Sequence, residues 1–187
     1  MLAKKIIFIM SLVLISKFSF SYNSLVDKVQ STVNSINYLA QSNDRTGEKL
    51  NLFIKNEFFP TLDIPTIADS ILYGLNINSM TNKEKSIFIF RLKQRILKDL
   101  LSKLVNNTGQ FQLVNIRNIN YSNVKATIKI NNYYDYPVIL NLLFRIKNNN
   151  WKIYDVLLNG DSLVRYYQKV ALSKLKRYGF QGMLIRF

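Results

Sequence analysis

The spacing of apolar residues changes once along the chain, close to Gly109, and this change constrains the fold more than any other feature of the sequence. Before it, apolar residues recur every three or four positions, which is typical of amphipathic helices. After it, apolar and polar residues alternate, which is typical of half-buried strands. The pattern predicts one domain of helices, then four antiparallel strands, then a final helix.

Local signals mark the limits of the predicted helices. Leu25 to Gln41 carries one apolar stripe, and Glu48 to Phe58 forms a second, short helix. Asp63 is expected to cap a third helix. The box Thr81-Asn-Lys-Glu84 predicts the start of a long fourth helix that runs to about Val105.

The second half of the chain predicts a meander. The strands are expected over residues 111–120, 124–131, 138–146 and 151–158. A tight Asn159-Gly160-Asp161 turn leads into the last helix, with Ser162 or Asp161 as its cap and Gly179 after its end at Tyr178. The fold class is therefore α+β, with the N-terminal helices and the C-terminal helix packed on one face of a four-stranded antiparallel sheet.

The first 21 residues have the pattern of a secretory signal peptide. Lys4 and Lys5 precede the apolar run Ile6 to Ile15, which is shorter than the roughly 20 residues that span a bilayer. Ser19-Phe20-Ser21 predicts cleavage before Tyr22. We expect residues 1–21 to be removed and residues 22–187 to form a single exported domain; an uncleaved anchor is the alternative.

The chain contains no cysteine and no histidine. It therefore lacks disulfides, thiolate nucleophiles, the commonest general base and the commonest zinc ligand. An enzyme built on this chain would have to use Asp, Glu, Lys or Tyr. The formal charge is +15, and the loss of the three lysines of the leader would leave +12, which favours anionic partners.

The C-terminal third resembles a known family. The stretch WKIYDVLLNGDSLVRYYQ, followed by a basic helix and Gly179-Phe-Gln-Gly182, is similar to the C-terminal signature of the MlaC family, the periplasmic phospholipid-binding components of an ABC-type lipid transport system. Leu62-Asp63-Ile64, Leu72-Tyr-Gly74 and the long helix with Phe88 also resemble it. The matching positions in the signature are Trp151, Tyr154, Asp155, Val156, Gly160, Ser162, Leu163, Val164, Tyr167, Gly179, Phe180 and Gly182.

The resemblance implies a periplasmic carrier that shuttles phospholipid between an outer-membrane lipoprotein complex and an inner-membrane ABC transporter complex, and so maintains outer-membrane lipid asymmetry. It implies a curved sheet and helices that enclose an apolar cavity, in a monomer that needs no catalytic residue, metal or cofactor and binds no nucleic acid. The expected wall of the cavity is Ile67, Ile71, Leu75, Phe88, Leu92, Ile96, Leu140, Leu142, Phe144, Val156, Leu163 and Tyr167.

Two alternatives remain open at the level of the sequence. In a small exported enzyme, Asp155 would act as a base on a hydrophobic substrate with help from Tyr154, whereas Ser162 has no histidine to activate it. The structural interpretation has Asp155 accept hydrogen bonds at the end of a strand and Ser162 cap the last helix.

The second alternative is a basic secreted binding protein without a cavity. Five cations of the last helix suggest it: Arg165, Lys169, Lys174, Lys176 and Arg177. These residues form either an ordinary solvated face or a surface that attracts anionic headgroups or an acidic docking partner.

Overall fold

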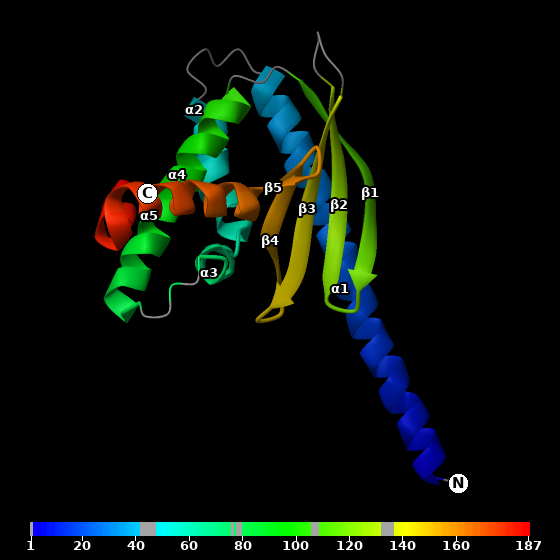
Figure 1. The fold of residues 1–187 in the computed structure, drawn as a ribbon. Coiled ribbons are helices and arrows are strands. Elements are labelled where there is room, and N and C mark those ends of the chain that lie inside the picture. Colours follow the sequence, from blue (N-terminus) through cyan, green and yellow to red (C-terminus); the bar gives the residue numbers. More distant parts are fainter. Residues whose placement is uncertain (1, 42–47, 76, 78–79, 106–108, 132–136) are drawn as a thin grey trace.

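The computed structural model describes residues 2–41, 48–75, 77, 80–105, 109–131 and 137–187, with side chains described from Tyr22 onward except for residues 103–105. The helical elements are α1 (Leu2–Gln41), α2 (Glu48–Phe53), η1 (Ile54–Phe58), η2 (Phe59–Thr61), α3 (Ile64–Tyr73), α4 (Asn82–Val105) and α5 (Leu163–Arg186). The strands are β1 (Gln110–Asn120), β2 (Asn123–Asn131), β3 (Val138–Lys147), β4 (Asn150–Leu158) and β5 (Asp161–Ser162) (Figure 1).

The fold class is the predicted one, helices combined with an antiparallel sheet. The predicted signal peptide forms the first half of α1, and its removal stays a prediction. In the part of the chain that the structure describes, no helix is both long and apolar enough to cross a membrane.

The sheet has five strands rather than the predicted four, in the order β1-β2-β3-β4-β5. The additional strand, β5, has two residues and pairs antiparallel with the end of β4. Asn159 and Gly160 both have positive φ, 50° and 92°, and such a two-residue turn folds the chain back on itself as a hairpin. The Asn159-Gly160 turn therefore places Asp161 and Ser162 beside β4 as a short strand before the last helix begins.

A β-bulge lies in the middle of β4. Leu143 of β3 lies opposite Asp155, whereas the next residue, Phe144, lies opposite Ile153, so that Tyr154 is an extra residue in β4. Side chains that alternate along a strand change face at such a bulge. For this reason Val156 above the bulge and Ile153 below it face the same side of the sheet.

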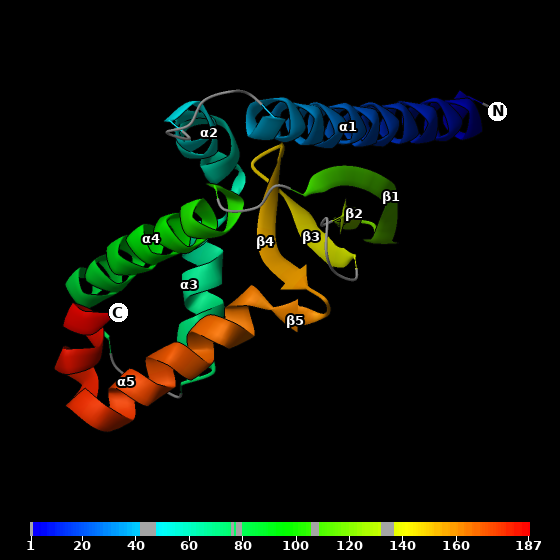
Figure 2. The ribbon, with the colours of Figure 1, turned by 90° about the horizontal axis from the view of Figure 1, so that it is seen from above.

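Helix α1 lies along β1 and is fastened to it by side-chain hydrogen bonds. The Asn37 amide donates to the Phe111 carbonyl oxygen at 2.7 Å and accepts from the Phe111 N–H at 2.8 Å. The Tyr22 hydroxyl donates to the Ile116 carbonyl oxygen at 2.8 Å. The helices α3, α4 and α5 gather beside β4, at the other end of the sheet (Figure 2).

The predicted caps of three helices are confirmed. The Thr81 N–H donates to Glu84 Oε2 at 2.9 Å and the Glu84 N–H donates to Thr81 Oγ1 at 3.2 Å, which is the reciprocal capping box of α4. Asp63 accepts from the Thr66 N–H at the start of α3, and Ser162 accepts from the Arg165 N–H at the start of α5.

Helix α5 does not end at Tyr178 as expected. Gly179 has φ 67°, which breaks the helix, but helical geometry resumes after it and continues to Arg186. Met183 is fully buried in this last segment, and the ring of Phe187 lies 4.8 Å from that of Phe88 in α4. The apolar C-terminus is therefore part of the core formed by the helices.

Candidate functional site

An apolar pocket of about 590 Å³ lies between the sheet, α1, the C-terminal half of α4 and the start of α5. This volume is within the range of about 300–1,000 Å³ that is common for ligand sites. The pocket is lined mainly by aliphatic and aromatic side chains. It can therefore take up a largely hydrocarbon ligand.

The sheet supplies one wall of the pocket. Alternate residues of β3 and the residues on either side of the β4 bulge point into it, since the bulge brings two successive parts of β4 to one face. The lining residues of β2, β3 and β4 are Ile128, Ile130, Val138, Leu140, Leu142, Phe144, Trp151, Ile153, Val156 and Leu158.

Helix α1 supplies the facing wall, which the sequence did not reveal. Its stripe of Leu25, Val29, Val33 and Ile36 lines the pocket, and all four are buried. The stripe itself is visible in the sequence. Its position against the pocket depends on how α1 packs across the sheet, and no local signal indicates that packing.

The structure divides the twelve residues of the predicted wall into two groups. Seven line the pocket: Ile96, Leu140, Leu142, Phe144, Val156, Leu163 and Tyr167. The other five lie outside it, in or against the core formed by the helices: Ile67, Ile71, Leu75, Phe88 and Leu92.

The reason for this division is the length of α4. Its apolar face is long enough to contact the hydrophobic core at one end and the pocket at the other. Phe88 and Leu92, in the N-terminal half, are fully buried in the hydrophobic core, and Phe88 contacts the C-terminal residue Phe187. Ile96 and Leu100, farther along the helix, reach the pocket.

A polar cluster borders the pocket where α4 meets α5. The Tyr167 hydroxyl donates to Asp99 Oδ2 at 2.8 Å, and Arg95 Nε donates to the same oxygen at 3.2 Å. Burial, together with the neighbouring Asp99, raises the pKa of Tyr167 far above its ordinary value. The hydroxyl therefore stays a hydrogen-bond donor and joins α5 to α4 beside the pocket.

Asp155 and Ser162 have structural roles. The Asp155 carboxylate accepts from the Val156 N–H at 2.8 Å, the Val164 N–H at 3.2 Å and the Ser162 hydroxyl at 2.6 Å. These contacts tie β4 to the start of α5. Burial and the nearby Asp155 raise the pKa of Tyr154, so that its phenol keeps its proton more firmly than a free tyrosine does.

Replacement of Asp155 is expected to weaken the fold. Asp155→Ala removes the acceptor of three hydrogen bonds, and we expect a loss of about 2 kcal/mol in the free energy of unfolding and a melting temperature lower by about 4–8 °C. Thermal unfolding followed by circular dichroism measures the change. Asp161→Ala, at an exposed residue six positions away, is the control and should change the melting temperature little. Equal melting temperatures of wild type and Asp155→Ala would contradict the structural role.

No group of three or more acidic, Cys or His residues in the described part of the chain could hold a metal ion. The site thus combines an apolar pocket, a curved antiparallel sheet and helices that close around its edge. These features define an α+β protein built to bind a hydrophobic molecule.

The chain belongs to the MlaC family, whose model, described as "MlaC protein", matches residues 25–186. Members of this family are periplasmic. Membership indicates that this chain is a binding or transport protein rather than an enzyme. No curated protein matches the chain.

A solved structure has a similar fold. The phospholipid-binding protein from Ralstonia solanacearum, solved in complex with a phospholipid, superposes with a TM-score of 0.66 at 18% sequence identity. The alignment covers 88% of this chain and 92% of that chain. The likeness therefore extends over nearly the whole domain.

Proposed function

We propose that this protein is a periplasmic phospholipid carrier. In this proposal residues 1–21 are removed on export, and residues 22–187 shuttle lipid between an outer-membrane lipoprotein complex and an inner-membrane ABC transporter complex, which maintains outer-membrane lipid asymmetry. The observation that carries the proposal is an apolar pocket of about 590 Å³ in a member of the MlaC family.

The physical requirement on such a carrier is simple. The two acyl chains of a phospholipid hold on the order of 28 methylene groups, and exposing them to water costs roughly 20 kcal/mol at about 0.8 kcal/mol each. A carrier must offer a hydrocarbon environment comparable to the bilayer, so that lipid can enter and leave with little change in free energy. An apolar pocket meets this requirement, and no catalytic group is needed.

We infer that the acyl chains contact both walls of the pocket. The sheet wall contributes Leu140, Leu142 and Phe144, and the α1 wall contributes Val29 and Val33. The bound phospholipid in the Ralstonia solanacearum protein, which has the same fold, supports a lipid as the ligand. The five expected wall residues in the core formed by the helices support the pocket only through the packing of α3, α4 and α5.

Native mass spectrometry of the protein purified from its own host tests the proposal. We expect a mass increment that corresponds to a phospholipid, and lipid extraction followed by mass spectrometry should identify it. In a second assay, the emptied protein should withdraw fluorescently labelled phospholipid from vesicles. A protein that carries no lipid and withdraws none is not a lipid carrier.

A further inference from the structure

Helix α5 has an unusually one-sided charge. It carries Arg165, Lys169, Lys174, Lys176, Arg177 and Arg186 and contains no acidic residue. Among the described residues, the ion pairs are Lys85–Asp69, Arg95–Asp99, Arg145–Asp63 and Lys147–Asp63, so that none of the six α5 cations is in one. Helices with many charges commonly pair them four residues apart, and α5 has no such pair.

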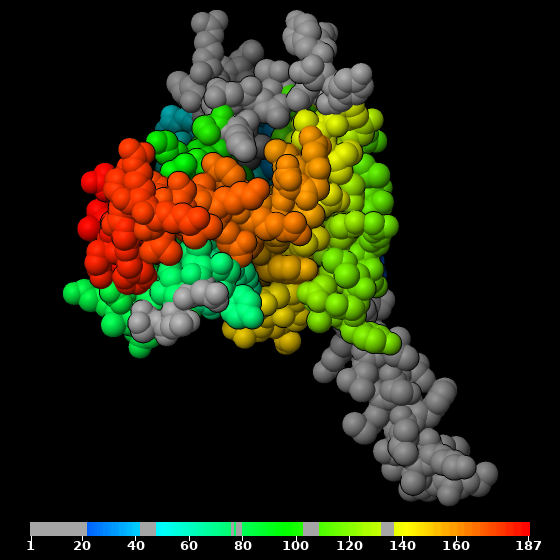
Figure 3. All heavy atoms as spheres, in the orientation of Figure 1, coloured from blue at the N-terminus to red at the C-terminus, as the bar shows by residue number. Residues whose placement is uncertain are grey.

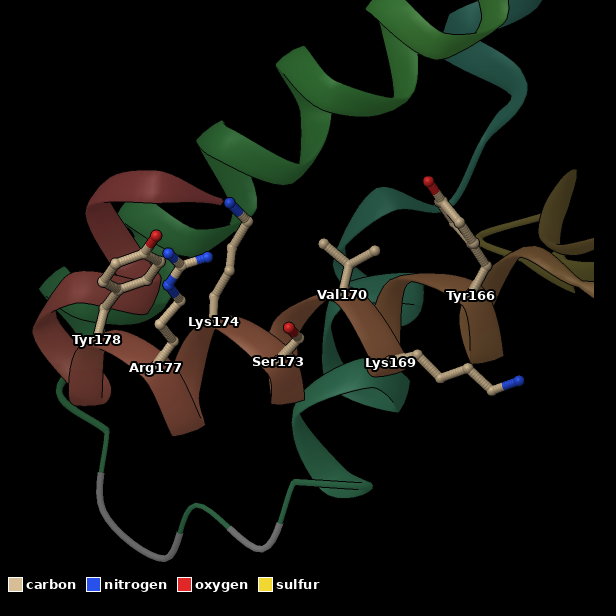
Figure 4. Close-up of a pocket in the computed structure, with 7 residues that line it drawn as sticks. All are labelled: Tyr166, Lys169, Val170, Ser173, Lys174, Arg177 and Tyr178. Carbon is tan, nitrogen blue, oxygen red and sulfur yellow. The ribbon is translucent and has the colours of Figure 1, made fainter.

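Part of this charge lines a groove of about 430 Å³ on the surface of α5. Lys169, Lys174 and Arg177 supply its cations, and Val170 supplies an apolar patch between them. Figure 4 shows Lys174, Arg177 and Tyr178 together at one end and Tyr166 at the other. In the space-filling view, α5 crosses one face of the molecule beside β4 (Figure 3).

Two arginines contact the ring of Tyr178, which lines the groove: Arg177, which also lines it, and Arg186, which does not. The guanidinium of Arg177 lies 5.2 Å from the centroid of the Tyr178 ring, and that of Arg186 lies 4.5 Å from it. Cation–π contacts use the face of the guanidinium and leave its N–H groups free. These N–H groups form a fixed fork that suits the oxygens of a phosphate.

Tyr166 links the groove to the lipid pocket. Its side chain lines both cavities, and it is 49% exposed. A partner that binds at the groove therefore lies directly beside Tyr166 and the pocket that Tyr166 also lines. This continuity favours a lipid surface over an acidic protein as the occupant, because lipid must reach the pocket from a bilayer or return to one.

We propose that the α5 groove docks the protein on the surface of a bilayer that contains anionic phospholipid. Lys169, Lys174 and Arg177 bind headgroup phosphates, and Tyr166 and Tyr178 lie at headgroup depth, where tyrosine is favoured at membrane interfaces. Docking would bring the pocket to the lipid that it loads. The choice of a bilayer as the occupant and the loading role both rest on the proposed function, but vesicle binding is measured separately from lipid content.

Co-sedimentation with vesicles tests the docking. We compare wild type with the triple variant Lys169→Gln/Lys174→Gln/Arg177→Gln, using phosphatidylcholine vesicles with and without phosphatidylglycerol. Each basic residue held near an anionic surface strengthens binding about fivefold, so the triple variant should lose on the order of 100-fold in affinity for the anionic vesicles. Wild-type binding should also weaken as salt is raised.

A matched variant separates the groove from net charge. Arg117→Gln/Lys125→Gln/Lys129→Gln removes one arginine and two lysines from β1 and β2, where Lys125 and Lys129 alternate with the buried residues of β2. All proteins keep the same N-terminus, and thermal unfolding checks that each is folded. We expect this variant to lose only a few-fold in affinity. Equal losses in both triple variants would overturn the proposal.

Two further outcomes are decisive. If wild-type protein binds immobilised polyglutamate but not anionic vesicles, it prefers an acidic protein to a bilayer, and the proposal is then wrong. Native mass spectrometry of the α5 variant reports on the pocket independently. Lipid retained by a variant that no longer docks supports separate docking and storage sites, and docking by a protein that never holds lipid would refute the carrier function alone.

Discussion

Leu142→Glu is expected to abolish lipid retention while leaving a protein that still unfolds cooperatively. Leu142 is 4% exposed, lines the pocket and lies between its β-sheet partners Ala126 and Val156. A carboxylate at this position would meet acyl chains in the loaded protein, and binding would be lost. In the empty pocket, water can hydrate the same carboxylate.

If Leu142→Glu instead unfolds the protein, Leu142 lies in a filled hydrophobic core and not in the wall of a pocket. A charge in a dry, filled core has no partner and costs several kcal/mol, which is a large part of the 5–15 kcal/mol that stabilises a typical domain. Outright unfolding of Leu142→Glu would therefore contradict a lipid-binding pocket at this position. Native mass spectrometry and urea unfolding, measured on the same preparation, separate the two results.

Leu143→Glu is the control for the face of the strand. Leu143 is half-buried, lies opposite Lys125 and Asp155, and is absent from the pocket lining. We expect this variant to retain its lipid. Equal loss of lipid from both variants would contradict the assignment of faces in β3.

Asp63→Asn is expected to produce the second large effect, a loss of stability that depends on pH. Asp63 is 3% exposed, and its carboxylate accepts from Lys147 Nζ at 2.7 Å and Arg145 Nη2 at 2.8 Å. Burial alone raises its pKa, but the hydrogen bonds from Lys147, Thr66 and Arg145 outweigh burial and lower the pKa from 3.8 to about 2. A shift of this size corresponds to roughly 2 kcal/mol of stability.

The sign of the pH dependence follows from the lowered pKa. The unfolded chain takes up a proton on Asp63 near pH 4, whereas the folded protein resists protonation until about pH 2. The stabilisation is therefore complete above pH 4 and is lost as the pH falls towards 2. Urea unfolding of wild type across this range should show the loss, and Asp63→Asn should be less stable at pH 7 and should lack that part of the pH dependence.

Asp69→Asn, in the helix α3 that Asp63 caps, is the matched control. Asp69 also contacts a lysine, Lys85, at 2.6 Å, but its side chain is 54% exposed. Exposed ion pairs contribute about 0–1 kcal/mol, so this change should alter stability little. Comparable losses from Asp63→Asn and Asp69→Asn would show that burial at Asp63 does not strengthen its contacts.

The local elements of this protein follow from its sequence. The alternation of β2, with Val124, Ala126, Ile128 and Ile130 buried, is visible directly in the residues. The capping box of Thr81 and Glu84 and the cap at Ser162 are local as well, because each joins residues three positions apart. Interactions of this kind depend on neighbours in the chain, and for that reason helix starts, strand faces and the Asn159-Gly160 turn could be predicted.

The composition of the pocket was decided by the tertiary structure. Phe88 and Ile96 lie on the same apolar face of α4, but the position of the C-terminal segment places one in the hydrophobic core and the other in the pocket. The bulge at Tyr154 brings Trp151 and Ile153 into the wall, against the simple alternation of β4. An apolar side chain has the same sequence signature whether it meets protein or ligand, and only the packing of distant segments determines which of the two surrounds it.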